Sequence, residues 1–220
     1  MTATEAYDKY LIKAEKNSVN DGLSTDKGRF VILYNEHQNR FVENIYERKG
    51  DDNIRYIQTL LVESKPIKSS GKENNYYKFE LPVNYFNFSN VYAKASKKDC
   101  VNKHIDLYEI KDTSRNYILS DEFTSPSFEY REAPFTFSDN AINVFTSDFQ
   151  VDSIILSYYR YPKQIVQVNP ENPESELDDS FELDFDDKVI DRIISDAVSG
   201  FDINNNSERF QLHKAVSQQK

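Results

Sequence analysis

The side chains best suited to catalysis or metal binding are few and scattered. The chain contains three histidines, His37, His104 and His213, and one cysteine, Cys100. No histidine has a second His or Cys at ligand spacing, so the sequence predicts no metal site. Cys100 and His104 could pair as in a cysteine hydrolase, but strand residues four apart lie about 13 Å from each other, beyond proton-transfer reach. We therefore expect no catalytic residue, no metal and no cofactor, and we expect the protein not to be an enzyme.

Phosphate and calcium loops are also disfavoured. With only five glycines, the chain has no glycine-rich phosphate loop. Residues 202–207 resemble the start of a calcium loop, but the sixth position is Ser207 rather than Gly and the twelfth is His213 rather than Glu. Both departures remove features that a calcium loop needs.

Acidic residues are concentrated in one segment. Residues 171–187 contain nine acids and no base, and removing these nine charges from the net −10 leaves −1 for the rest of the chain. Such clusters can form a glycosidase pair or a metal cluster, but in a Pro/Asn/Ser-rich segment they favour a solvated, self-repelling loop. A chain without a basic face is not expected to bind nucleic acid.

Aromatic residues are abundant, with fifteen Tyr, fifteen Phe and no Trp. They could fill the core, form a carbohydrate platform or lie in a subunit interface. Three of them, Tyr158, Tyr159 and Tyr161, stand close together in one predicted strand. Because strand side chains alternate between faces, one face would join the core and the other would be covered by a helix or a neighbouring subunit.

Residues 1–65 have the periodicity of a helical region. Thr4 is a candidate cap for a first helix, and Ser24 or Thr25 begins a long second helix that ends near Lys49. A third helix is expected to follow. Apolar residues recur at spacings of three and four within these helices, at Tyr7, Tyr10, Leu11, Ala14, Phe30, Leu33, Tyr34, Phe41, Ile45, Ile54, Ile57, Leu60 and Leu61. Gly28 in the second helix indicates close packing or a frayed first turn.

Strands are predicted in the middle of the chain, after a polar linker over residues 66–75. Alternation over residues 77–81 and further short apolar runs indicate an antiparallel β-domain over residues 76–168. The strongest hairpin signal pairs residues 141–145 with residues 153–161. Strands without intervening helices predict an antiparallel sheet or sandwich.

The C-terminal part reads as an acidic loop over residues 169–183, followed by helices over residues 184–220 that pack with the N-terminal helices. Asp184 or Asp186 can cap the first of these helices, and Ser207 begins the second. The fold class predicted is therefore α+β, with N-terminal helices, an antiparallel β-domain and a C-terminal helical pair. The sequence shows no secretory signal pattern and no run of apolar residues long enough for a membrane span, which predicts assembly inside a cell without a membrane partner.

Two N-terminal segments, residues 4–13 (TEAYDKYLIK) and 26–42 (DKGRFVILYNEHQNRFV), resemble virion structural proteins of crAss-like and related Bacteroidetes phages. The remaining plan is similar to the head–tail adaptor, or ring, proteins of short-tailed phages. That likeness is carried by a Leu-Pro-x-x-Tyr element at residues 81–85, a Tyr/Pro strand exit at residues 158–162, and an acidic start to the C-terminal helices at residues 184–187.

The resemblance implies a homo-oligomeric ring, commonly of twelve copies, that lies beneath the portal in the virion, extends the DNA channel and joins further rings or the tail. It would assemble in the host cytoplasm, and DNA would pass through without specific binding. A C-terminal tail with Phe210, Leu212 and His213 would dock into the portal, or would form an ordinary terminal helix. Tyr158, Tyr159 and Tyr161 become candidate inter-subunit aromatics. The candidate lumen acids are Glu171, Glu174, Glu176, Asp178 and Asp179.

Two other functions remain open on the sequence. The first is a tail or baseplate module whose aromatic β-domain recognises a glycan. The second is a hydrolase using the clustered acids, which would require two carboxylates converging in a pocket.

Overall fold

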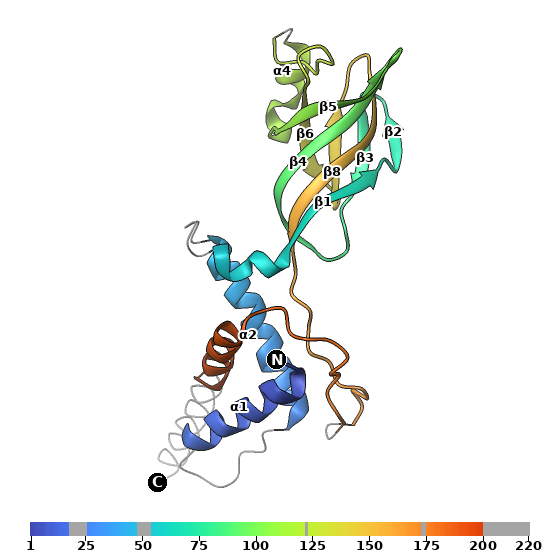
Figure 1. Ribbon diagram of the computed structural model, residues 1–220. Coiled ribbons are helices and arrows are strands. Elements are labelled where there is room, and N and C mark those ends of the chain that lie inside the picture. Colours follow the sequence, from blue (N-terminus) through green and yellow to red (C-terminus); the bar gives the residue numbers. More distant parts are fainter. Residues whose placement is uncertain (18–25, 48–53, 122, 173–174, 200–220) are drawn as a thin grey trace, which may run out of the picture. The chain divides into compact units, whose positions relative to one another are not determined.

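The structure is a computed structural model that describes residues 1–17, 26–47, 54–121, 123–172 and 175–199 (Figure 1). It divides into two compact units, one formed by Met1–Leu60 with Pro162–Lys220 and the other by Leu61–Tyr161. We call them the helical unit and the β-unit. Helices together with a curled mixed sheet of eight strands confirm the α+β class.

The helical unit begins with α1 (Ala3–Asn17) and α2 (Lys27–Glu47). The two helices meet through aromatic rings, with Phe30 lying 5.3 Å from Tyr7, 5.2 Å from Tyr10 and 5.6 Å from Tyr34 between ring centroids. Tyr10, Phe30 and Tyr34 are fully buried, so the three-and-four spacing identified the correct helix faces.

The helix starts differ from the expected ones. The Glu5 N–H donates to Thr2 Oγ1 at 3.3 Å and the Thr2 N–H donates to Glu5 Oε2 at 3.0 Å, so Thr2 rather than Thr4 caps α1 in a reciprocal capping box. In α2 the Arg29 N–H donates to Asp26 Oδ1 at 2.6 Å. An aspartate is a strong cap because its carboxylate accepts from exposed helix N–H groups.

The third helix is present in its described part, where Ile54 is helical and a 3₁₀ helix follows, but the predicted linker over residues 66–75 is wrong. A short 3₁₀ helix, η1 (Arg55–Leu60), leads directly into strand β1 (Leu61–Lys68), and β2 (Gly71–Glu73) follows. β1 is an edge strand of the sheet, mostly exposed, and carries Pro66 and a bulge at Ser64 with φ 50°. Edge strands tolerate proline and polar residues, which is why this segment resembles a linker in sequence.

Six further strands complete the β-unit: β3 (Tyr76–Glu80), β4 (Tyr85–Lys97), β5 (Cys100–Glu109), β6 (Glu132–Ser138), β7 (Ala141–Phe145) and β8 (Gln150–Arg160). Their order is β1-β8-β4-β5-β6-β7-β3-β2. All neighbours are antiparallel except β5 and β6, which are parallel. This pair corrects the expectation of a purely antiparallel sheet.

The predicted hairpin between β7 and β8 is also wrong. β7 pairs with β6 and β3, whereas β8 pairs with β1 and β4. The connecting residues carry Phe149, which is buried at 5.8 Å from the ring of Phe128. The short connection therefore joins non-adjacent strands of the curled sheet, and its aromatic side chain fills the core.

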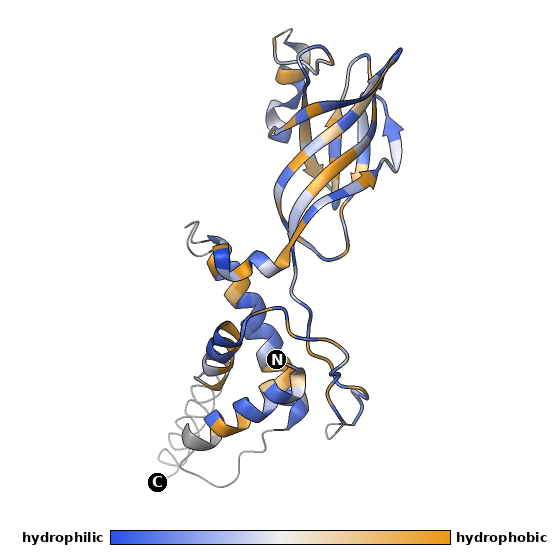
Figure 2. Ribbon diagram, in the orientation of Figure 1, coloured by the Kyte–Doolittle hydropathy of each residue, from blue (hydrophilic) through white to orange (hydrophobic). Residues whose placement is uncertain are grey.

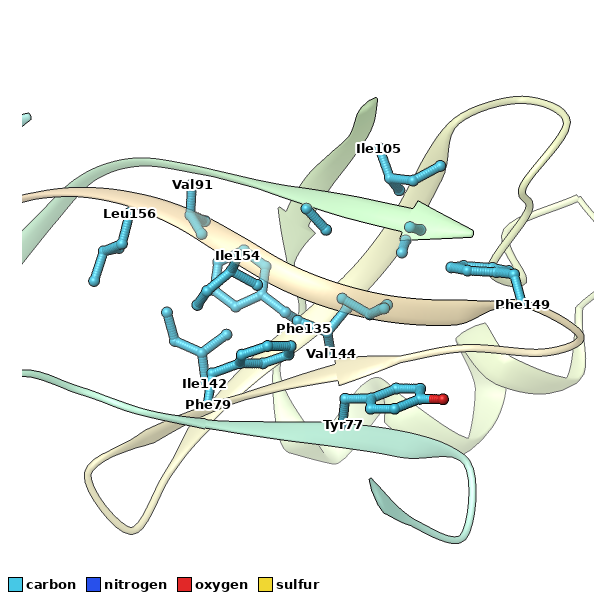
Figure 3. Close-up of a cluster of buried hydrophobic side chains, with 14 of the residues drawn as sticks. Tyr77, Phe79, Val91, Ile105, Phe135, Ile142, Val144, Phe149, Ile154 and Leu156 are labelled. Carbon is cyan, nitrogen blue, oxygen red and sulfur yellow. The ribbon is translucent and has the colours of Figure 1, made fainter. Parts of the chain in front are cut away.

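The core of the β-unit lies on the inner face of the curled sheet. Alternating hydrophobic and hydrophilic residues along the strands are visible in Figure 2. The inward side chains labelled in Figure 3 come from strands β3 to β8 and from the β7–β8 connection: Tyr77, Phe79, Val91, Ile105, Phe135, Ile142, Val144, Phe149, Ile154 and Leu156. Aromatic rings replace the leucines that would ordinarily fill such a core.

The parallel pair requires a long connection from β5 to β6. This crossover contains η2 (Asp112–Ser114) and α4 (Arg115–Ser120), neither of which buries a residue.

The chain re-enters the helical unit at Pro162, and residues 187–199 are helical. The Val189 N–H donates to Asp186 Oδ1 at 2.9 Å, which confirms Asp186 as a cap. The expected apolar stripe is buried, at Val189, Ile190, Ile193, Ile194, Ala197 and Val198. Lys13 of α1 bonds this helix, with Nζ 2.9 Å from Asp191 Oδ1 and 2.7 Å from Ser195 Oγ. The predicted last helix, from Ser207, lies outside the described residues.

Candidate assembly surfaces

Among the described residues, the side chains best suited to chemistry are dispersed, with His37 on α2 and both His104 and Cys100 on β5. His104 Nε2 lies 2.9 Å from Asp106 Oδ1 on the exposed surface of β5, and the His104 ring stacks on Tyr92 at 4.3 Å. Cys100 is exposed at the start of the same strand. Within residues 1–17, 26–47, 54–121, 123–172 and 175–199, no group of three or more His, Cys, Asp or Glu could hold a metal ion.

A small hollow of about 80 Å³, lined by both polar and apolar side chains, lies between α2 and the helix at residues 187–199. His37 and Arg40 line it from α2, while the Arg192 guanidinium lies 5.7 Å above the Phe41 ring. Burial, together with the Arg40 charge, lowers the pKa of His37, which favours its neutral form. Arg40 also forms an ion pair with Glu36 at 2.7 Å. We therefore interpret the hollow as a gap between two packed helices.

The acidic segment is more ordered than a solvated loop. Its chain folds back on itself, with the Val168 N–H donating to the Glu176 carbonyl at 2.9 Å and the Asp178 N–H donating to the Val166 carbonyl at 3.0 Å. Ser175 Oγ donates to the Asn169 carbonyl at 2.7 Å and closes the turn. The segment is thus a small antiparallel ladder with its own turn.

Several carboxylates of this segment bind backbone N–H groups of the helical unit. Asp179 Oδ1 accepts from the Thr4 N–H at 2.9 Å, and Asp184 Oδ2 accepts from the Lys163 N–H at 2.6 Å. Asp178 Oδ1 accepts from the Ser180 N–H at 2.9 Å. Together with Asp186, these acids hold helix starts and chain reversals, so part of the local negative charge is neutralised by backbone dipoles.

The pKa values of two of these acids follow from their bonds. Hydrogen bonds from Ser180 hold the pKa of Asp178 below its usual value. Burial raises the pKa of Asp179, but hydrogen bonds from Thr4, Thr2 and Ala3 outweigh burial and lower it overall. Of the other candidate lumen acids, Glu171 and Glu176 are exposed, and Glu174 lies outside the described residues.

A short strap, residues 162–168, lies along α2. Asn35 Nδ2 donates to the Ile165 carbonyl at 2.8 Å, and Asn35 Oδ1 accepts from the Ile165 N–H at 2.9 Å. One turn further on, Gln38 Nε2 donates to the Lys163 carbonyl at 2.9 Å. Two side-chain amides thus replace a strand neighbour for the strap backbone, a role that neither residue signals by its type or spacing.

The candidate inter-subunit aromatics lie mostly within the fold. Tyr158 is buried in the core of the β-unit and donates to Asn84 Oδ1 at 3.0 Å. Tyr159 points to the opposite face and is also buried. Tyr161 is exposed and packs edge-on against Phe86 at 5.1 Å.

The most exposed aromatics of the β-unit lie on the β5–β6 crossover instead. Tyr117 of α4 is 73% exposed, Phe123 is 93% exposed and Tyr130 is 84% exposed. Exposed aromatic groups of this kind mark binding surfaces more often than single apolar residues do. We call these three residues the crossover aromatics. Tyr117 and Phe123 could not be identified from the sequence, because no periodicity distinguishes them from core residues.

The helical unit has its own exposed apolar side chains, Ile12 on α1 and Ile32 on α2, which are 54% and 67% exposed. Ile32 lies in an open hollow of about 540 Å³ beside Gly28, Gln167 and Pro170. A Cβ at Gly28 would lie 3.3 Å from Asp26 Oδ1 and 3.4 Å from Gln167 Oε1, so a larger residue there would require only a small shift of these side-chain ends.

The proposed portal-docking residues Phe210, Leu212 and His213 lie outside the described residues. In the part that the structure covers, no helix combines the length and apolar character needed to cross a membrane. No family model and no curated protein matches the chain.

Proposed function

We propose that this chain is a structural virion protein that forms an oligomeric head–tail connector ring beneath the portal. The ring, commonly of twelve copies, extends the DNA channel and joins a neighbouring ring or the tail. The likeness of residues 4–13 and 26–42 to virion proteins of crAss-like phages supports this assignment. Both segments form the two packed N-terminal helices.

The observation that carries the proposal is that each unit exposes large apolar side chains. The helical unit exposes Ile12 and Ile32, and the β-unit exposes the crossover aromatics. A subunit of a stacked ring needs contacts with its neighbours in the ring and with the rings above or below. Exposed apolar side chains on both units would provide two separate sets of contacts, as such a subunit requires.

The charge distribution is compatible with a DNA conduit. The chain carries a net charge of −10, and the exposed acids Glu171 and Glu176 stand on the segment proposed to face the lumen. A wall that repels phosphate lets DNA pass without being held, since tight DNA binding requires a basic surface.

Imaging of the purified full chain by electron microscopy, alone and with the portal protein from the same genome, tests this proposal. Closed rings that bind the portal are the expected result, and native mass spectrometry would count the copies. A chain that stays monomeric at high concentration, both alone and with the portal, would overturn it.

A glycan-binding tail or baseplate module is the second candidate, and the crossover aromatics are the observation that favours it. Aromatic side chains 73–93% exposed on one connection could stack on sugar rings. Saturable binding to host glycans by monomeric protein, lost in Tyr117→Ser and Phe123→Ser, would favour this function over the connector.

A further inference from the structure

The β5–β6 crossover is tied to the sheet through its second half, residues 124–131, which we call the fixed half. Phe128 is buried. Lys103 Nζ of β5 donates to the Phe128 carbonyl at 2.9 Å, and Lys97 Nζ of β4 lies 2.7 Å from Glu129 Oε1. Because side chains from two strands hold two successive residues, the backbone of the fixed half has little freedom to leave the sheet.

The first half of the crossover, η2 and α4, is bonded only to the crossover itself in the described part of the chain. Arg115 Nη1 lies 3.1 Å from Asp112 Oδ1, and Thr124 Oγ1 donates to the Ile118 carbonyl at 3.1 Å. Neither helix buries a side chain, and α4 has only six residues, too few for a helix to be stable by itself. We therefore expect this half to open more readily than the strands.

The strand registers identify the face of the sheet beneath the crossover. Tyr108 of β5 pairs with Pro134 of β6. Two residues further along β6, Thr136 pairs with Asn143 of β7. These side chains share the outer face of the sheet, opposite the core, because strand side chains alternate. The Tyr108 hydroxyl donates to the Thr124 carbonyl at 2.6 Å, which places the end of the first half over β5.

The start of α4 lies near β3, on the same outer face. Tyr76 of β3 pairs with Phe145 of β7, and their rings are 5.6 Å apart. A hydrogen bond to Glu73 raises the pKa of Tyr76, and the nearby charge of Arg115 partly opposes this shift. With Arg115 near β3 and Thr124 over β5, α4 spans the two strands between them, β6 and β7.

The part of β6 and β7 under α4 is polar. Thr136 and Asn143 are 4% and 9% exposed, and neither belongs to the core cluster. Among the described residues, Asn143 Oδ1 is buried without a hydrogen-bond partner. A buried, unpaired amide oxygen destabilises the covered arrangement, and water can bind it once the cover is lifted. Opening therefore exposes groups that water satisfies.

We propose that η2 and α4 form a flap that opens from the sheet while the strands and the fixed half stay folded. Closed, the flap covers Thr136 and Asn143; open, it exposes them. The flap carries Tyr117, whereas Tyr130 belongs to the fixed half, so opening separates two of the crossover aromatics. This inference concerns the β-unit alone and does not depend on ring formation.

Limited proteolysis of the full chain with chymotrypsin compares two tyrosines of similar exposure, Tyr117 at 73% and Tyr130 at 84%. Proteases cut segments that open, so cleavage after Tyr117 should be about tenfold faster than cleavage after Tyr130, as measured by mass spectrometry. Equal rates, or faster cleavage after Tyr130, would overturn the flap. Lys97→Met, which removes the pair with Glu129, should speed cleavage after Tyr130 and leave cleavage after Tyr117 unchanged.

Cysteine labelling tests whether the covered face becomes exposed. In a Cys100→Ser background, which removes the exposed native thiol, Thr136→Cys places a thiol under the flap and Val144→Cys places one in the core. Thr and Val have the same shape, so the two substitutions change packing alike. Thr136→Cys should react with a thiol reagent about tenfold faster than Val144→Cys, because local opening is more frequent than global unfolding.

The dependence of labelling on urea separates the two kinds of opening. Local opening exposes little surface, so the rate for Thr136→Cys should barely change in low urea, whereas the rate for Val144→Cys should rise steeply. Equal rates with the same urea dependence would show that Thr136 is exposed only when the whole unit unfolds, and would overturn the flap. Circular dichroism checks both folds; if either variant is unfolded, proteolysis of the wild-type chain decides alone.

Discussion

Asn35 and Ile165, 130 residues apart in the chain, exchange two hydrogen bonds of 2.8 and 2.9 Å, with the side-chain amide of one meeting both backbone polar groups of the other. The strap that includes Ile165 carries the chain from the β-unit back into the helical unit. Its backbone is satisfied by α2 rather than by a neighbouring strand.

Asn35→Ala should therefore destabilise the helical unit by about 1–3 kcal/mol, because two backbone groups of the half-buried strap lose their partners. Urea unfolding followed by circular dichroism measures the change. Asn44→Ala, an exposed position on the same helix, serves as the control and should stay near wild type. Equal stability of both variants would show that water replaces the Asn35 bonds.

Asp179→Ala should destabilise α1, because its carboxylate accepts the Thr4 N–H in the first turn of that helix. The expected loss is about 0.5–2 kcal/mol, the range found for helix caps. Thermal unfolding measures it. Glu176→Ala removes an exposed carboxylate of the same segment and is the matched control; a loss as large as that of Asp179→Ala would point to net charge rather than capping.

Acid should weaken the helical unit through Asp178 and Asp179. Both have a pKa lowered in the folded state, so the unfolded chain takes up protons first as pH falls. Their contribution is present above about pH 4, the usual aspartate value, and is lost as pH falls from there through the folded values. Urea unfolding at stepped pH should show a shallower loss below pH 4 in the Asp178→Asn, Asp179→Asn double variant. Parallel curves would contradict this role.

Phe123→Ser combined with Tyr117→Ser should leave the unfolding temperature unchanged, because both rings are exposed and contribute little burial. Binding to the portal or to a neighbouring ring should fall, since exposed aromatics dominate interface energies. Co-sedimentation with the partner measures the loss, and Val101→Ser on the same unit is the control. Unchanged binding would show that the contact with the portal or the neighbouring ring does not involve these two aromatic residues.

The β-unit should fold on its own. Residues 61–161 form a compact unit with a separate core, and Leu61 near its start pairs with Tyr159 near its end. Circular dichroism and amide dispersion in NMR spectra of this fragment should resemble those of the whole chain's sheet. A coil-like spectrum would mean that the helical unit is needed for folding.

Local patterns in the sequence predicted the helices well. Tyr10, Phe30, Tyr34 and the stripe from Val189 to Val198 are buried as their spacing indicated. These signals work because the helix period lies within a few residues.

What escaped prediction depends on distant partners. Asp179 caps a helix 175 residues away, and no local pattern identifies such a bond. The β7–β8 connection resembles a hairpin turn in sequence, but β7 and β8 do not pair with each other. Phe149 in this connection is buried and contacts the ring of Phe128. β1 was missed because an edge strand with Pro66 buries too few side chains to show alternation. The exposed Ile12 and Ile32 likewise stand out only once the buried faces are known.

The pairing of Leu61 with Tyr159 brings the entry and exit of the β-unit to adjacent strands. A segment with neighbouring ends can be replaced by another sheet of different size without moving the flanking helices. We therefore expect the β-unit to tolerate replacement by a different domain in related proteins. Lineages would then diversify what the protein contacts through this segment while keeping an inherited helical frame.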